Sequence, residues 1–452
     1  MPRPGHHTCM VDLVTLKNSS APRGWLSAES KTREAEIRSA LDFTDTNLVS
    51  DRIGALIARN RAIHDADCIN LNPASNMMNA RAESALAAGL TTRASLGHAG
   101  AKYEMGLEAI EEIEVIAAEL ACRVFDAKYA ELRVASGSLA NLYAFMATCK
   151  PGDPIIVPPA SIGGHVTHRA EGAAGLYGLT IHECKVDPDT FTYDVEALGK
   201  LADRVQPKLI TVGTSLNLLP HPMLEIRRIA DRVGANVLFD AAHACGLIAG
   251  RAWSNPLSQG ADLMTMSTYK SLGGPAGGLV LTNRSDLAER IDAIAYPGLT
   301  ANFDAGKTAA LAITLLDWLE NGEPYADAMV RTAAALGQEL AQLGLPLYRP
   351  GGDFSQSHQL ALDATRWGGG HASAVRLRKA NLLTSAIGLP TSTEMIGLRL
   401  GTPEIVRMGM TTTDMAELAG LINDGLTSDP CAVAPRASAM RRRFPTVHYV
   451  RS

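Results

Sequence analysis

Short apolar segments alternate with helical segments along the middle of the chain, and this alternation limits the folds that the chain can adopt. The segments that read as strands are residues 131–134, 154–158, 208–213 and 236–240, with one more around His182. The stretches between them place apolar residues at three- and four-residue steps, which predicts helices. Strands joined by helices form right-handed βαβ crossovers. The sequence therefore predicts an α/β fold with a mostly parallel sheet covered by helices.

The pattern changes toward both ends of the chain. Two helices are predicted near the N-terminus, at residues 29–41 and 48–64, after a segment with little periodicity. From about Gly322 onward, helices and short strands follow one another in a way that predicts a smaller α+β domain. We therefore expect an N-terminal arm with two helices, a large domain, a small domain and a C-terminal tail, at residues 1–66, 67–321, 322–428 and 429–452.

Composition argues against several functional classes. A chain of 452 residues with 46% hydrophobic and 20% charged residues is typical of an ordered globular protein. Its net charge of −5 and the lack of an extended basic stripe argue against nucleic acid as a partner. The seven cysteines include no CxxC pair, so we expect no disulfide framework, no metal site and a cytoplasmic protein. No segment has the length and apolarity of a signal peptide or a membrane span.

Two candidate functional residues stand at the ends of apolar segments. Lys270 follows LMTMSTY and precedes the glycine-rich turn SLGGP, at the edge of a sheet where ligands bind. A solvated loop lysine is the ordinary alternative. Asp240 ends the apolar segment VLF, with His243 three residues later. A buried carboxylate needs a positive partner, which a protonated pyridine nitrogen would supply, although an acid that caps the next helix also fits.

Two further segments suggest binding sites for anions. Ser136, Gly137 and Ser138 lie where a strand gives way to a helix, whose unpaired N–H groups favour a phosphate. An ordinary serine N-cap explains the same pattern equally well. Arg399 comes from a short apolar strand flanked by glycines, which leave room for a carboxylate against the guanidinium. A surface arginine on a strand is the alternative.

These segments together resemble the serine hydroxymethyltransferase family of pyridoxal-phosphate (PLP) enzymes, which have the fold of the aspartate aminotransferases, PLP fold type I. The resemblance covers residues 70 to 426, and its five motifs occur in the family's order. The motifs are ASGSLAN, SIGGHVTH, LFDAAHACGLIAG, STYKSLGGPAGGL and GLRLGTPEIVRMGM. The resemblance implies a large domain with a seven-stranded, mostly parallel sheet and a smaller α+β C-terminal domain.

The resemblance also implies roles for single residues. Lys270 matches the lysine that forms a Schiff base with PLP, Asp240 the partner of the pyridinium nitrogen, and His243 a contact on the phenolate side of the cofactor. Arg399 matches the arginine that binds the carboxylate of the amino acid. The other residues implied in cofactor binding are Ser136, Gly137, Ser138, Ser215, Tyr269 and Gly298. Gly298 matches a glycine that reaches the phosphate of the neighbouring subunit, which implies a homodimer, or a dimer of dimers, with shared active sites.

Some positions depart from the family in the region that binds folate. The glutamate needed for folate-dependent one-carbon transfer is replaced by Leu96, and the tyrosine two residues before it by Ala94. Tyr103 keeps a neighbouring tyrosine of the family, and we expect it near the substrate. These differences make the use of tetrahydrofolate doubtful, whereas the residues for amino-acid chemistry are kept.

Histidines near the expected site leave the proton-transfer group open. The histidine that stacks on the cofactor ring in the family is replaced by Ile162. His165 and His168 follow in the same loop, and His98 lies beside Leu96, so each is a candidate for proton transfer. A structural role fits each of them as well. We take His165 as the catalytic candidate and expect His98 on the substrate side.

The sequence therefore predicts a PLP-dependent enzyme that cleaves or forms the Cα–Cβ bond of β-hydroxy-α-amino acids such as serine, α-methylserine or threonine, with an aldehyde as the second partner. A tetrahydrofolate-dependent hydroxymethyltransferase is the first alternative. An aminotransferase or a β-eliminating lyase would share Lys270, Asp240 and Arg399. A cofactor-binding protein without enzymatic activity would have no need of the lysine.

Overall fold

The structure is a computed structural model that describes residues 23–390, 392 and 394–451. The start of the expected N-terminal arm, residues 1–22, lies outside the described residues. The chain divides into two compact units, residues 1–65 and 66–452. The first unit contains helices α1, Ala28–Ser39, and α2, Thr46–Arg61, close to the two predicted helices. Both helices begin where a side chain caps them, because Ser27 and Asp45 accept hydrogen bonds from backbone N–H groups of the first turn.

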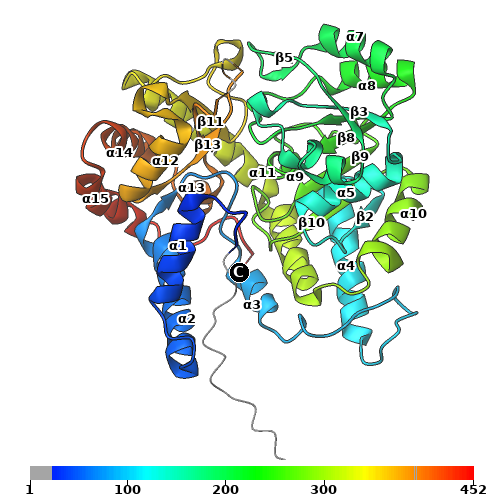
Figure 1. Cartoon of the computed structure of the whole chain (residues 1–452), viewed down its shortest axis with the longest axis horizontal. Coiled ribbons are helices and arrows are strands. Elements are labelled where there is room, and N and C mark those ends of the chain that lie inside the picture. Colours follow the sequence, from blue (N-terminus) through cyan, green and yellow to red (C-terminus); the bar gives the residue numbers. More distant parts are fainter. Residues whose placement is uncertain (1–22, 391, 393, 452) are drawn as a thin grey trace, which may run out of the picture. The chain divides into compact units, whose positions relative to one another are not determined.

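The centre of the second unit is a seven-stranded sheet in the order β2-β10-β9-β8-β7-β3-β4 (Figure 1). Its strands are β2 Tyr129–Glu131, β3 Pro154–Val157, β4 Thr180–Glu183, β7 Leu209–Val212, β8 Asn236–Asp240, β9 Leu263–Ser267 and β10 Gly278–Thr282. The five strands from β9 to β4 are parallel, and β10 runs antiparallel to both of its neighbours. The predicted α/β fold with a mostly parallel sheet is confirmed.

Helices cover both faces of this sheet. Consecutive strand residues such as Ile155 and Ile156 belong to two different apolar clusters, so each strand is buried on both sides. One cluster includes residues of α4 Glu108–Phe125, α7 Val195–Val205, α8 Met223–Val233 and α9 Cys245–Ala249. The other includes residues of α5 Gly137–Thr148, α6 Ala173–Leu176 and α10 Ser285–Ala293.

Strand β2 lies earlier in the chain than the sequence suggested. Only Tyr129–Glu131 pair with β10, whereas a strand was predicted at residues 131–134. The backbone N–H of Val134 donates to the carbonyl of Leu132 at 2.8 Å, so the chain turns away from the ladder after β2.

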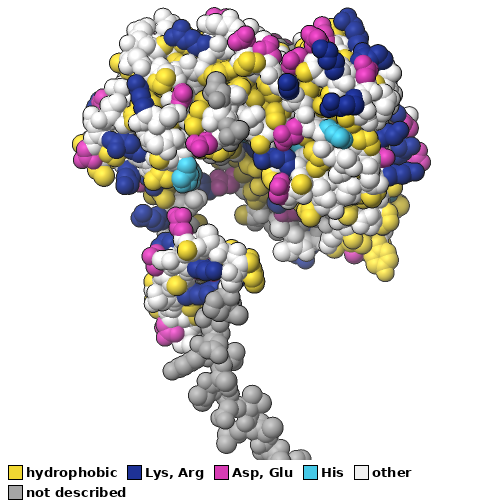
Figure 2. Space-filling view, turned by 45° about the horizontal axis from the view of Figure 1, so that its top comes forward, with side chains coloured by type: hydrophobic (Ala, Val, Ile, Leu, Met, Phe, Trp, Pro, Cys, Tyr) yellow, Lys and Arg dark blue, Asp and Glu magenta, His cyan; other side chains and the backbone are white. Residues whose placement is uncertain are grey.

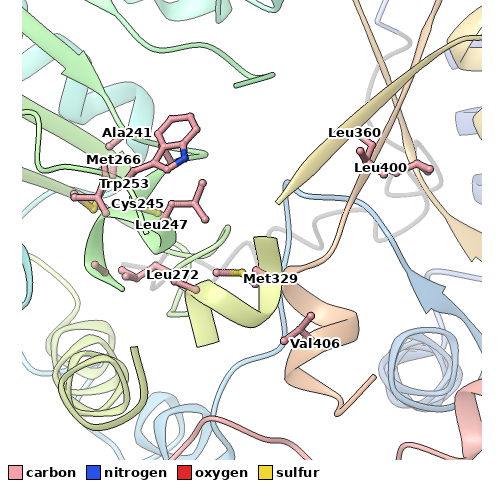
Figure 3. Close-up of a cluster of buried hydrophobic side chains, with 14 of the residues drawn as sticks. Ala241, Cys245, Leu247, Trp253, Met266, Leu272, Met329, Leu360, Leu400 and Val406 are labelled. Carbon is pink, nitrogen blue, oxygen red and sulfur yellow. The ribbon is translucent and has the colours of Figure 1, made fainter. Parts of the chain in front are cut away.

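A single long helix, α11, spans residues Ala305–Gln342 and contains Pro324 in its interior. The sequence predicted a helix only at residues 309–320 and a domain boundary at about Gly322, which lies inside α11. Whether the chain divides there into two domains remains a prediction. The larger apolar cluster continues from Met266 of β9 past Met329 of α11 to Leu360 and Leu400 (Figure 3).

The C-terminal part forms a second sheet. Its order is β11-β14-β13, with all neighbours antiparallel, and the strands are β11 Gln359–Asp363, β13 Ser385–Ile387 and β14 Gly397–Gly401. A separate pair joins β1 Ile69–Asn70 to β12 Leu382–Leu383. The helices of this part are α12 Gly369–Lys379, α13 Pro403–Arg407, α14 Met415–Thr427 and α15 Pro430–Arg442. Residues 429–452, expected as a tail, therefore contain helix α15.

Within the described ranges, no helix combines the length and apolarity that crossing a membrane requires. On the face shown in Figure 2, lysine and arginine side chains lie among aspartate and glutamate side chains and form no continuous basic area.

Candidate active site

A pocket lies beyond the carboxyl ends of strands β7, β8 and β9, where parallel sheets bind their ligands. The structure brings most of the predicted site residues together in its lining. They are Ser136, Gly137, Ser138, His165, Ser215, Asp240, His243, Tyr269 and Lys270. Asn141, Thr214, Ala242 and Ser267 complete the lining.

Lys270 follows β9 and is buried, with 6% of its surface exposed. Its Nζ lies 3.2 Å from Nε2 of His243. Burial lowers the pKa of Lys270 below its ordinary value, although the negative charge of Asp240 opposes this shift. The amine forms no ion pair with a carboxylate among the residues that the structure describes. A buried amine with a lowered pKa is suited to act as a nucleophile.

Asp240 is held as an anion by three hydrogen-bond donors. Its Oδ2 accepts from Nδ2 of Asn141 at 2.9 Å and lies 3.0 Å from Nε2 of His168, while Oδ1 accepts from the backbone N–H of Ala242 at 3.0 Å. Burial alone would raise the pKa of Asp240, but the hydrogen bonds from His168 and Asn141 and the charge of Lys270 hold it well below its ordinary value. The charged carboxylate can therefore pair with a protonated ring nitrogen.

Two buried side chains, His168 and Asn141, hydrogen-bond to Asp240. Asn141 was not among the predicted site residues, and the role of His168 in proton transfer remains a prediction. His168, one of the candidates for proton transfer, is fully buried and directs Nε2 at Asp240. Asn141 also donates to Thr167 at 2.9 Å and accepts from Thr265 at 2.7 Å, so it joins α5 to β9. Its position three residues after Ser138, on the same face of α5, is the sequence signal that would have indicated it.

His165 lines the pocket from the loop after β3. Its Nδ1 accepts a hydrogen bond from the backbone N–H of Thr167 at 3.3 Å and lies 3.0 Å from the Thr167 hydroxyl. Burial lowers the pKa of His165, so the ring is neutral at pH 7 with its proton on Nε2. Ile162, which replaces the stacking histidine of the family, is buried in an apolar cluster with Leu216 and Ile387.

The N-terminus of α5 faces the pocket. Ser136 caps the helix by accepting from the backbone N–H of Leu139 at 3.2 Å. A Cβ atom on Gly137 would lie 2.2 Å from Oγ of Ser267, so the close approach of the two segments requires glycine here. The N-terminus of α5, together with the half-buried Ser136 and the exposed Ser138, therefore forms a site suited to an anion.

Arg399 on β14 lies next to this pocket, with 6% of its surface exposed. Its Nε donates to Oγ of Ser385 at 3.1 Å, and its Nη1 donates to the carbonyl of Ser215 and lies 3.5 Å from Nε2 of His243. Burial lowers the pKa of Arg399 to about 10, so the guanidinium stays charged at pH 7. No carboxylate of the described ranges pairs with it. A buried cation without a counter-ion is suited to bind an anionic substrate group.

Besides Arg399, three predicted residues lie outside the pocket. Tyr103 is 80% exposed and the side chain of His98 is 57% exposed. Nε2 of His98 lies 3.0 Å from a carboxylate oxygen of Asp292. Gly298 lies in the turn formed by residues Ile294–Leu299. None of the three lines the pocket that holds Lys270. Their expected roles, on the substrate side for Tyr103 and His98 and toward a neighbouring subunit for Gly298, remain predictions.

Comparison with known proteins decides the family. Residues 49–422 match the family model described as serine hydroxymethyltransferase. The chain belongs to the serine hydroxymethyltransferase family. The resemblance inferred from the five motifs is thus confirmed.

The similar proteins include two groups of curated relatives. An alpha-methylserine aldolase of Variovorax paradoxus is 56% identical over 431 residues, which cover 95% of this chain and 98% of the relative. An alpha-methylserine aldolase of a Ralstonia species is 54% identical over 402 residues, 88% of this chain and 92% of the relative. The serine hydroxymethyltransferase of Methanopyrus kandleri is 36% identical over 389 residues, 84% of this chain and 91% of the relative.

The residues of the pocket fit PLP. The N-terminus of α5 offers N–H groups and hydroxyls to a phosphate, and Gly137 lines the pocket at this point. The anionic Asp240 matches a pyridinium nitrogen, and the buried amine of Lys270 matches an aldehyde. All of these groups line one pocket.

Proposed function

We propose that the protein is a PLP-dependent aldolase that cleaves the Cα–Cβ bond of β-hydroxy-α-amino acids, with α-methylserine as its main substrate. One observation carries this choice of substrate. The relatives named alpha-methylserine aldolase are 54 to 56% identical to this chain, whereas those named serine hydroxymethyltransferase are 34 to 36% identical. The pocket geometry supports the same chemistry, because a buried amine, an anionic carboxylate and a buried guanidinium lie in or beside one pocket.

The proposed reaction converts α-methylserine into formaldehyde and alanine. The hydroxyl proton is removed, the oxygen forms the carbonyl of formaldehyde, and the electrons of the Cα–Cβ bond stay on Cα. Cα then takes up a proton to give alanine, so atoms and charge balance. The chemistry that PLP supplies when bound is an electron sink for the negative charge on Cα.

Each role at the site follows from the contacts described above. Asp240 would hold the protonated ring nitrogen, and its lowered pKa keeps it charged for that purpose. Ser136, Gly137 and Ser138 would hold the phosphate, and Lys270 would hold the aldehyde carbon. Arg399 would bind and orient the carboxylate of the amino acid.

His165 is the residue that we propose for proton transfer at the β-hydroxyl. It lines the pocket with a neutral ring, and Thr167 fixes the direction of that ring. His165→Asn should lower kcat more than it changes KM, because the hydrogen bonding is partly kept and the titratable group is lost. If this variant kept the native kcat, another group would have to transfer the proton of the β-hydroxyl.

We further propose that two subunits share their active sites in a homodimer. The support is the exposure of Tyr103 and of the neighbouring Met105 and the position of Gly298 outside the pocket of its own subunit. Mixing two inactive variants tests this, one with Lys270→Ala and one with Tyr103→Ala. Partial activity after mixing supports shared sites, and its absence in a mixture that forms hybrid dimers contradicts them.

A substrate panel tests the function directly. The purified protein, loaded with PLP, is given α-methylserine, serine or threonine with and without tetrahydrofolate, and the aldehyde released is measured. We expect formaldehyde from α-methylserine without tetrahydrofolate. Serine is the matched control because it lacks only the α-methyl group. Release that depends on tetrahydrofolate would make the protein a hydroxymethyltransferase, and a keto acid product would indicate transamination or β-elimination.

A further inference from the structure

Gln359, the first residue of β11, is fully buried and reaches three groups around the pocket. Its Oε1 lies 2.7 Å from the backbone nitrogen of Asn217. Its Nε2 lies 3.2 Å from the carbonyl oxygen of Ser215 and 3.3 Å from Nδ1 of His243. The side chain therefore connects the C-terminal sheet to the loops that follow β7 and β8.

The two backbone groups fix the orientation of this amide. The N–H of Asn217 can only donate, so the atom that it meets is the amide oxygen of Gln359. The carbonyl of Ser215 can only accept, so the atom that it meets belongs to the NH₂ group. A flipped amide would place two donors together at one end and two acceptors at the other. It is therefore the NH₂ group that faces Nδ1 of His243.

This orientation determines which ring nitrogen of His243 carries the proton. Nδ1 must accept a hydrogen bond from Gln359, and a neutral imidazole has one donor and one acceptor nitrogen. Burial, together with the charges of Lys270 and Arg399, lowers the pKa of His243 well below its ordinary value, so the ring is neutral. The proton of the neutral ring then lies on Nε2.

Nε2 of His243 faces the reactive side of the pocket. It lies 3.2 Å from Nζ of Lys270 and 3.5 Å from Nη1 of Arg399. The guanidinium and a charged ammonium can only donate, so the amine of Lys270 can accept from an Nε2–H group only when it is neutral. The NH₂ group of Gln359 and the amine of Lys270 thus contact opposite nitrogens of the same imidazole ring.

We propose that Gln359 is a positioning residue that fixes His243 in the Nε2–H tautomer. In this tautomer the ring presents a hydrogen-bond donor beside the guanidinium of Arg399, and the two donors together can bind an oxygen anion. In the opposite tautomer a lone pair would point at the same place and repel that anion. The proposal adds a residue to the site of the proposed function, but the tautomer exists whether or not the reaction is an aldol cleavage.

Nitrogen NMR of the full-length protein, labelled with ¹⁵N in histidine, tests the tautomer in the native chain. His243→Asn identifies the signals of this ring by their loss. We expect the chemical shift of an unprotonated nitrogen for Nδ1 and that of a protonated nitrogen for Nε2. A protonated Nδ1 in the native protein would overturn the proposal, and this measurement needs no variant of Gln359 to fold.

Gln359→Glu tests the cause. The change keeps the shape of the side chain but replaces the NH₂ group by an oxygen. An ionised carboxylate has no donor, so this oxygen can accept a hydrogen bond but cannot donate one. We expect Nδ1 of His243 to become protonated and kcat/KM for α-methylserine to fall about 10- to 100-fold, as is usual when the outer partner of a functional histidine is lost. A folded Gln359→Glu protein with an unchanged tautomer would overturn the proposal.

Gln356→Glu is the matched control. It makes the same chemical change three residues earlier, on an exposed side chain that does not line the pocket. We expect native kcat/KM and a native tautomer for this variant. If it lost as much activity as Gln359→Glu, the added charge would explain both results and the proposed role of Gln359 would fail.

Discussion

Replacing Arg399 by methionine should separate substrate binding from stability. Methionine is close to arginine in length but carries neither charge nor donors. The guanidinium is buried on β14 and has no carboxylate partner in the part of the chain that the structure describes. The contribution of Arg399 to substrate binding and its contribution to the free energy of unfolding should therefore differ in size. Both can be measured on one variant.

The loss in binding should be large. If Arg399 pairs with the carboxylate of the amino acid in a desolvated pocket, truncating it removes a buried charge pair at a cost of about 2–5 kcal/mol. This cost corresponds to a fall in kcat/KM of about 30-fold to several thousand-fold. Arg399→Lys keeps the charge but not the two-pronged donor, so its fall should be smaller.

The effect on folding should be smaller because two contributions oppose each other. Lowering the pKa of Arg399 from 12.5 to about 10 means that the folded state holds this charge at a cost of about 3 kcal/mol. The variant recovers that cost and loses the two hydrogen bonds to Ser385 and Ser215, worth about 1.5–3 kcal/mol each. The free energy of unfolding should therefore fall by between zero and about 3 kcal/mol.

Two measurements complete this test. Formaldehyde release at varied α-methylserine concentration gives kcat/KM, and urea unfolding of the PLP-free protein gives the free energy of unfolding. Unchanged kcat/KM together with marked destabilisation would refute the reasoning, because Arg399 would then be a structural residue and the carboxylate would bind elsewhere.

Three further predictions concern the cofactor and pH. Lys270→Ala should abolish aldehyde release and the visible absorbance of bound PLP; an absorbing, active variant would contradict this. Gly137→Ala should weaken PLP binding by about 1–3 kcal/mol, because the added Cβ meets a serine hydroxyl at 2.2 Å, whereas Gly420→Ala, with nothing within 4 Å, should not. Burial lowers the pKa of His221 to about 4 and of His358 to about 3, so the unfolded chain binds more protons below pH 6.5. These two histidines should therefore reduce the free energy of unfolding by about 3–4 kcal/mol between pH 7 and pH 5, and asparagine at both positions should remove this pH dependence in urea unfolding.

The sheet and the residues at its strand ends were readable from the sequence. Strands buried on both faces appear as short apolar runs, and Asp240 and Lys270 stand out because each places a charge at or shortly after the end of such a run. Since parallel strands end at the same edge, the two residues had to lie near each other. The motifs of the family added the roles, which local patterns alone left open.

Partners that are distant in the chain were not readable. His168 lies 72 residues from Asp240 and Gln359 lies 116 residues from His243, and no local period connects either pair. The length of α11 was missed for a different reason. Gly322 and Pro324 are typical helix breakers, but packing on both sides of them overrides their low helix propensity. Trp318 donates to the carbonyl of Leu272 at 2.8 Å.

The continuity of α11 has a mechanical consequence for the choice of substrate. Before Pro324 the helix is attached through Trp318 to the segment that carries Lys270. After Pro324 it is attached through Tyr325, which donates to the carbonyl of Pro403 at 2.7 Å, to the segment that follows β14 and Arg399. Moving the guanidinium away from the amine therefore requires α11 to bend, and a bend is easiest at Pro324, which has no N–H for the helix ladder. While α11 keeps one shape, the positions of Lys270 and Arg399 relative to each other change little, and we expect the site to favour amino acids whose amine and carboxylate share one carbon over their longer homologues.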